Sequence, residues 1–150
     1  MADDKKLSTD QLLDLLFMES NLERLMEKGS ESLGMPDFPD YISALCRQRG
    51  EVPERVINRA NIEKSYGHQL FSGRRKPSRD TVLQLAFGFE MDYNAAQELL
   101  KIARKSLLHP KVKRDMVIVF CLQHGSSIVE CQLALEKYGL PLLGEGGRNE

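Results

Sequence analysis

Four polar side chains lie at a helical spacing that places them on one outer face. They are Lys64, Ser65, His68 and Gln69, and residues four apart are neighbours on the surface of an α-helix. Lys64 can reach guanine acceptors or a phosphate, Gln69 can pair with adenine, and Ser65 is small enough to allow close approach. His68 is either a base contact or, more commonly, a solvated surface residue. These four residues are candidates for noncovalent contacts with the bases of a nucleic acid.

Basic residues follow this segment directly. Arg74, Arg75 and Lys76, together with Arg79, are candidates to contact phosphates and to set the register on a duplex without reading its sequence. The alternative is a loop whose charges only keep the surface soluble. The spacing after the polar face favours phosphate contacts.

The distribution of charge supports that preference. The 150 residues carry 21 Lys and Arg against 22 Asp and Glu, a formal net charge of −1. Residues 64–114 hold 11 basic and 4 acidic side chains, a net of +7, whereas residues 1–63 have a net of −5 and residues 115–150 a net of −3. A basic block between acidic ends suggests a polyanion-binding surface, and the alternative is that these side chains only solvate helix surfaces.

Two short helices must position these side chains. Pro53 suits the first position of a helix over about 53–60, and Asn61 tolerates the left-handed conformation of a tight corner. A second helix over about 63–72 ends at Gly73, a natural C-cap. This arrangement matches a helix-turn-helix, in which the first helix braces on the DNA backbone and the second enters the major groove. Tyr66 and Leu70 are expected to pack inward.

The stretch resembles the lambda-repressor-like helix-turn-helix family, of the Cro and phage-repressor (XRE) type. Asn61 and Ile62 hold the corner, residues 63–72 form the candidate recognition helix, and GRRKPS at 73–78 follows in family order. The resemblance covers about residues 38–106. It implies a sequence-specific DNA-binding regulator of transcription, with double-stranded DNA as its partner. It also implies a dimer whose recognition helices lie about 34 Å apart on a two-fold site.

Three positions depart from the family pattern. Ile57 stands where the family usually has a small residue, and Gly67 stands where it usually has a branched apolar one. A glycine inside a helix costs roughly 0.5–1 kcal/mol relative to alanine. Our hypothesis is that Ile57 fills the space that Gly67 vacates, which conserves volume. Pro53 replaces a Gln that often contacts phosphate in the family.

The remaining elements are also predicted to be helical. Apolar residues recur at close to a 3.6-residue period from a capping box at Ser8 and Gln11 to a glycine cap at Gly29. Further helices are expected over about 39–49, 79–89 and 93–106. No segment alternates as a strand does, so the predicted fold class is all-α: a lambda-repressor-like bundle with an N-terminal helix and an added C-terminal helical hairpin. The predicted organisation is as follows: N-terminal helix and linker, 1–37; helix-turn-helix domain, 38–108; C-terminal hairpin, 109–143; tail, 144–150.

Residues 79–108 repeat in residues 114–143, at an offset of 35. Seven of the 30 aligned positions are identical, including the opening pair Arg79-Asp80 against Arg114-Asp115. This repeat predicts two stacked helical hairpins, each burying the face that the other leaves open. The C-terminal hairpin and the N-terminal helix are the candidate homodimer surfaces, and packing within the chain is the alternative.

Other chemistries are not indicated. The three histidines lack partners at zinc spacing, no phosphate-binding glycine motif is present, and we predict neither an enzyme nor a cofactor. Three cysteines in no paired spacing predict reduced, mostly buried thiols. No 18-residue apolar run or secretory signal is found, so we expect a cytoplasmic protein without a membrane partner. The rival function is an interaction adaptor that retains the scaffold and has lost DNA binding.

Overall fold

The computed structural model describes residues 8–18 and 36–144, and the chain divides into two compact units, residues 1–36 and 37–150. In the first unit, helix α1 spans Thr9–Met18. Its predicted capping box is confirmed: the Ser8 N–H donates to Gln11 Oε1 at 2.8 Å, and the Gln11 N–H donates to Ser8 Oγ at 3.2 Å. The predicted cap at Gly29 and the start of the linker lie outside the described residues.

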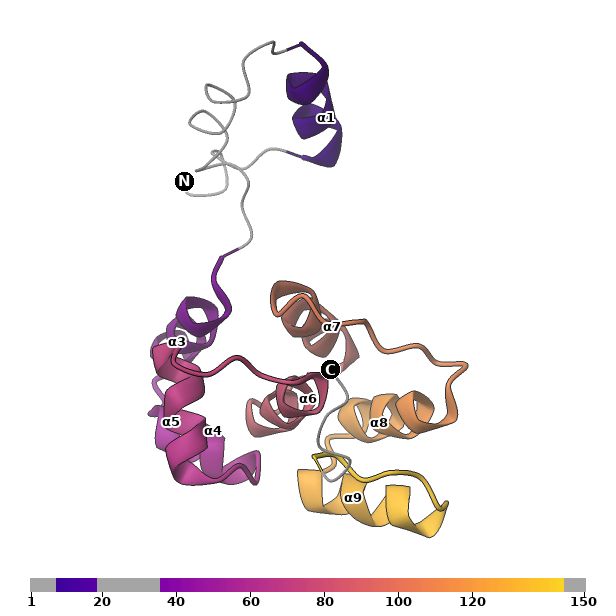
Figure 1. The fold of residues 1–150 in the computed structure, drawn as a ribbon. Helices are drawn as coiled ribbons and strands as arrows, with labels where there is room; N and C mark the ends of the chain where they lie inside the picture. The colour runs from indigo at the N-terminus through magenta and orange to yellow at the C-terminus, as the bar shows by residue number, and fades with distance from the viewer. Residues whose placement is uncertain (1–7, 19–35, 145–150) are drawn as a thin grey trace. The chain divides into compact units, whose positions relative to one another are not determined.

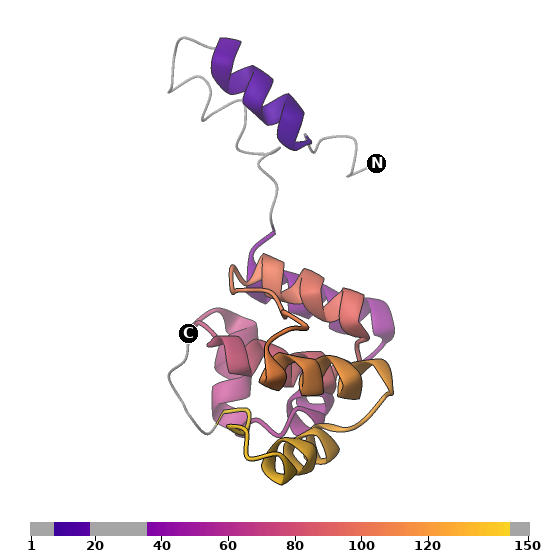
Figure 2. The same cartoon turned by 90° about the vertical axis from the view of Figure 1, so that its right-hand side faces the viewer.

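The described residues of the second unit are entirely helical outside their turns and loops, as predicted. The helices are α3 (Phe38–Arg49), α4 (Pro53–Arg59), α5 (Lys64–Ser72), α6 (Arg79–Gly88), α7 (Tyr93–Ile102), α8 (Lys113–Gln123) and α9 (Ile128–Lys137). In Figure 1, α6 lies between the α3–α5 group and the α8–α9 hairpin. Figure 2 shows α7 and α8 side by side.

Helix α6 is the centre of the core, because every residue from 80 to 88 is buried. Its last residue, Gly88, packs directly on α4. A Cβ atom there would lie 2.6 Å from the Val56 carbonyl oxygen and 2.9 Å from the Ala60 Cβ, so this approach requires glycine. The Arg59 Nε then donates to the Gly88 carbonyl at 2.9 Å. These contacts fix α4 against the core helix.

Helices α4 and α5 meet at Gly67, one of the positions that depart from the family pattern. A Cβ atom on Gly67 would lie 2.5 Å from Ile57 Cγ2, and Ile57 is itself buried. Ile57 therefore fills the space in front of Gly67, and the packing that we hypothesised is confirmed. Asn61 between the helices has φ 58°, the predicted left-handed conformation.

Two buried ion pairs join the repeated hairpins α6–α7 and α8–α9. Arg79 Nη2 lies 2.9 Å from Asp115 Oδ2, and Arg114 Nη2 lies 2.9 Å from Asp80 Oδ2. Each arginine also donates to two carbonyls at the end of its own repeat, at positions that differ by 35 residues. Contacts that interchange in this way are typical of an approximate two-fold axis, here within one chain.

Polar side chains close each hairpin in the same manner. The Gln97 side chain accepts from the Leu108 N–H at 2.8 Å and donates to the Leu108 carbonyl at 3.2 Å. Gln132 makes the equivalent pair of bonds with Leu143, at 2.8 and 2.9 Å. Equivalent hydrogen bonds therefore recur at the same 35-residue offset as the sequence repeat.

Helix α7 ends at Ile102, four residues earlier than predicted. Arg104 adopts φ 61°, the Arg104 N–H donates to the Lys101 carbonyl, and the Lys105 N–H donates to the Leu100 carbonyl. These two bonds form a Schellman motif, which terminates a helix with a left-handed residue. The prediction was wrong because that residue is usually glycine, and here it is arginine.

All three cysteines are buried and free, as predicted. Burial and the neighbouring Cys121 thiol raise the pKa of Cys131 well above its ordinary value. A high pKa leaves little of the reactive thiolate, so this thiol serves as packing.

Candidate nucleic-acid interface

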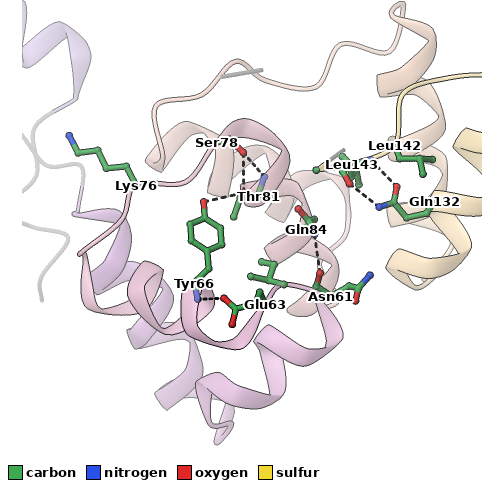
Figure 3. Close-up of a pocket in the computed structure, with 12 residues that line it drawn as sticks. Asn61, Glu63, Tyr66, Lys76, Ser78, Thr81, Gln84, Gln132, Leu142 and Leu143 are labelled. Atoms are coloured by element: carbon green, nitrogen blue, oxygen red, sulfur yellow. Dashed lines mark hydrogen bonds between the residues drawn. The ribbon is translucent and has the colours of Figure 1, made fainter. Parts of the chain in front are cut away.

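The inner side of α5 anchors it to the rest of the unit. Gly67 and Leu70 are buried, and the Tyr66 hydroxyl lies 3.5 Å from Thr81 Oγ1. That oxygen is in turn 3.0 Å from Ser78 Oγ, the N-cap of α6 (Figure 3). The inward packing predicted for Tyr66 and Leu70 is confirmed. The opposite side of α5 is consequently held outward in a fixed orientation.

The four base-reading candidates lie together on that outer side. Lys64, Ser65, His68 and Gln69 line one shallow, open depression, whose border also includes Arg74. Three of the four side chains are exposed, and Gln69 is half-buried. The structure thus brings the predicted polar face and the first cation of the following loop into one surface.

The loop after α5 is turned by its glycine. Gly73 has φ 86° and caps the helix, and the Arg75 N–H donates to the Gln69 carbonyl at 3.2 Å. Arg74, Arg75 and Lys76 are all exposed. Figure 3 shows the Lys76 side chain extending away from the neighbouring hydroxyl groups. These three cations are available beside the outer face of α5.

Arg79, the fourth phosphate candidate, is placed differently. Its side chain is only 14% exposed, and its guanidinium binds the Asp115 carboxylate and the carbonyls of Ser106 and Leu107. The physical reason is the repeat, which supplies a buried carboxylate opposite this position. Its role in the structure is to join the two hairpins, and we leave it out of the candidate surface.

An acidic residue that the sequence analysis did not single out lies on the same surface. The Lys64 ammonium is 2.9 Å from Glu54 Oε2, and His68 Nε2 is 3.9 Å from that oxygen. The hydrogen bond from Lys64 lowers the pKa of Glu54, and the same bond raises the pKa of Lys64. Ten residues separate the pair, so no helical spacing reveals it.

Glu63 occupies the N-terminal end of α5. Its carboxylate accepts from the Tyr66 N–H at 2.8 Å and from the Ser65 N–H at 3.0 Å, and these bonds lower its pKa. The first turn of a helix is a natural anion site. In this protein the chain's own carboxylate fills that site, so a phosphate is expected to approach the loop cations instead.

A polar hollow lies behind α5, between the α4–α5 corner and the C-terminal segment (Figure 3). The Gln84 side chain lines this hollow and donates to the Ala60 and Asn61 carbonyls at 3.2 and 3.4 Å. In the described parts of the chain, no buried side-chain nitrogen or oxygen lacks a partner. Sequence reasoning missed this hollow because it joins residues that are far apart in the chain.

Comparison with known protein families, curated proteins and solved structures found no match. Within residues 8–18 and 36–144, no helix is both long and apolar enough to cross a bilayer. The same residues contain no cluster of three His, Cys, Asp or Glu side chains that could hold a metal ion.

Proposed function

We propose that this protein is a sequence-specific, double-stranded-DNA-binding regulator of transcription. In this proposal α4 and α5 form a helix-turn-helix, and α5 is the recognition helix. The observation that carries the proposal is the single exposed surface on which Lys64, Ser65, His68 and Gln69 meet Arg74. Helix α5 is firmly packed on its other side, so this surface is presented without rearrangement of the core.

The proposed surface makes two kinds of contact with DNA, one with base edges and one with phosphates. Lys64 and Gln69 are suited to the acceptor and donor groups of base edges in the major groove. Arg74, Arg75 and Lys76 are suited to phosphates, which supply most of the affinity and make it dependent on salt. The proposed interface therefore reads bases with α5 and fixes its register with the loop.

In this scheme Glu54 competes with DNA for the Lys64 ammonium group. Lys64 must exchange the Glu54 carboxylate for a base edge or a phosphate when a duplex binds. The pair is exposed, and exposed pairs of this kind contribute little to stability, so separating it costs little. The carboxylate lowers affinity for any duplex, and a contact of Lys64 with a base edge or a phosphate offsets this effect.

The alternative function is a protein-interaction adaptor on the same scaffold. Glu54 and Glu63 favour it, because both place negative charge on the face that would meet phosphates. A partner protein with basic side chains would suit these carboxylates. Such an adaptor would not need the cations of the loop.

The deciding experiment replaces Arg74, Arg75 and Lys76 with alanine in the full chain. Sites are first selected from a random DNA pool, and affinity is then titrated against salt. We expect the triple variant to lose at least about tenfold in affinity. The slope of the logarithm of the binding constant against the logarithm of the salt concentration should also become shallower by about 3.

The matched control replaces Lys101, Lys105 and Lys111, which removes the same charge away from α5 and should leave most of the affinity intact. Failure of the wild-type chain to retard any duplex at low salt would overturn the regulator and favour the adaptor. Equal losses in the two triple variants would assign the binding to net charge instead of to this surface.

A further inference from the structure

The outer side of the C-terminal hairpin exposes an unusual amount of apolar surface. Most of the exposed large apolar side chains in the described residues lie between positions 112 and 138. They are Val112, Met116, Phe120, Val129, Leu133 and Tyr138. Met116, Phe120 and Tyr138 line a groove between α8 and α9, together with Val117 and Ala134. We call this the α8–α9 groove.

The internal repeat shows what kind of surface this is. Phe120 is equivalent to Leu85 of the first repeat, and Met116 is equivalent to Thr81. Leu85 is fully buried and Thr81 is nearly so, whereas Phe120 is 59% exposed and Met116 is 52% exposed. The two hairpins have equivalent sequences and contacts, yet the face that carries these equivalent positions is buried only in the first hairpin.

In the first repeat α4 packs directly on α6, and side chains of α3 and α5 also reach this hairpin. The Tyr66 hydroxyl of α5 reaches Thr81, and the Arg49 guanidinium of α3 lies 5.6 Å from the centre of the Phe89 ring. Phe89 is equivalent to His124, which in the second repeat stacks on exposed Phe120. The α8–α9 groove is thus the counterpart of a face on which helices already pack.

Opposite charges lie at the two ends of the groove. Lys113 begins α8 and Lys137 ends α9, so both lie at one end of the hairpin, whereas Glu130 lies near the other end, next to the short connection at 124–127. A two-fold axis across the groove would set the lysine end of one chain on Glu130 of another. A surface that is complementary to itself under such rotation is what an isologous dimer requires.

We propose that the α8–α9 groove is a homodimer interface, in which a second copy of this chain packs its own α8–α9 hairpin in antiparallel orientation. Phe120, Met116 and Tyr138 form the buried centre, and residues of these types are enriched in interface cores. The lysines and Glu130 form the rim. This interface is separate from the proposed DNA surface on α5 and does not depend on DNA binding.

The test measures the mass of the full chain by sedimentation equilibrium over a range of concentrations, without DNA. We expect a dimer for the wild-type chain, and a dissociation constant at least about thirtyfold higher for Phe120→Glu, as for a central interface residue. Val52→Glu is the matched control, because Val52 is 58% exposed and lies outside the groove. It should dimerise like the wild type.

Two further variants keep the test decisive if Phe120→Glu does not fold. Met116→Glu changes a neighbouring exposed side chain and should also give monomers. Glu130→Gln retains the acceptor that caps α9 at Ser127 but removes the charge, and should weaken the dimer roughly two- to fivefold at low salt. A wild-type chain that is monomeric at every concentration, folded groove variants that dimerise normally, or equal disruption by Val52→Glu would each overturn the proposal.

Discussion

The α4–α5 region and the paired hairpins use charge in opposite ways. On α5, the side chain of Lys64 is 72% exposed and pairs with Glu54, which is 54% exposed. In the hairpins, Arg79 and Arg114 are each 14% exposed and bind carboxylates that are almost fully buried. The comparison teaches that one basic block of sequence supplies both a surface that can exchange partners and a structural framework that cannot.

The difference follows from the cost of removing a charge from water. An exposed pair gains little and loses little when it separates. A buried pair has lost its hydration, so each charge requires its partner and further hydrogen bonds. The hairpins meet this need with bidentate contacts and backbone carbonyls. The α4–α5 region is instead joined by apolar fit, with Ile57 against Gly67.

The largest effect is expected from Asp115→Ala. This change leaves Arg79 buried without its carboxylate and should lower the free energy of unfolding by about 3–5 kcal/mol, measured by urea denaturation. Asp80→Ala should cost a similar amount, since the two pairs are equivalent under the repeat. Adding Arg79→Ala to Asp115→Ala should recover part of the loss. Strict additivity of the two changes would show that the pair is not a structural unit.

The apolar fit in α4–α5 is tested by a second cycle. Gly67→Ile should destabilise the protein by roughly 1–3 kcal/mol, because its side chain would overlap Ile57. Combined with Ile57→Ala, the same change should cost far less, since the new isoleucine occupies the vacated space. Calorimetric melting of the two single variants and the double variant measures the coupling, and independent effects would refute it.

A smaller effect is expected on the exposed side of the comparison. Glu54→Gln frees Lys64 and removes a carboxylate from the proposed DNA surface. Affinity for a selected duplex should rise by roughly two- to fivefold at low salt, in the range expected for an exposed pair. Fluorescence anisotropy measures this change, with Glu98→Gln as a control on α7. A fall in affinity would show that Glu54 supports DNA binding and would overturn its proposed role as a competitor for Lys64.

The smallest effect concerns the cap of α5. Backbone N–H groups hold the pKa of Glu63 below its unfolded value, so its contribution to stability is present above that value, about 4.3, and is lost as the pH falls through the folded pKa. Melting temperatures between about pH 3 and 6 should therefore decline less for Glu63→Gln than for the wild type. Parallel curves would indicate that this carboxylate does not stabilise the helix.

Local features of the fold were predictable because they depend on near neighbours in the chain. Asn61 adopts the left-handed corner, Gly73 caps α5, and Ser8 Oγ accepts from the Gln11 N–H at 3.2 Å, all as predicted. The end of α7 was not predicted, although the repeat contained the signal. Arg104 is equivalent to Gly139, and both adopt positive φ, at 61° and 68°.

The amino-acid sequence by itself determined roughly where the helices lie, which glycines turn the chain, and that residues 79–108 recur 35 positions later, because propensity, capping and periodicity act over a few residues. Only the tertiary structure decided which charges remain available. It buried Arg79 on Asp115, set Glu54 against Lys64, and left Phe120 open where its counterpart Leu85 is covered. The physical reason is that hydration and Coulomb energies depend on what surrounds a group in space, and neighbouring residues in the chain do not specify those surroundings.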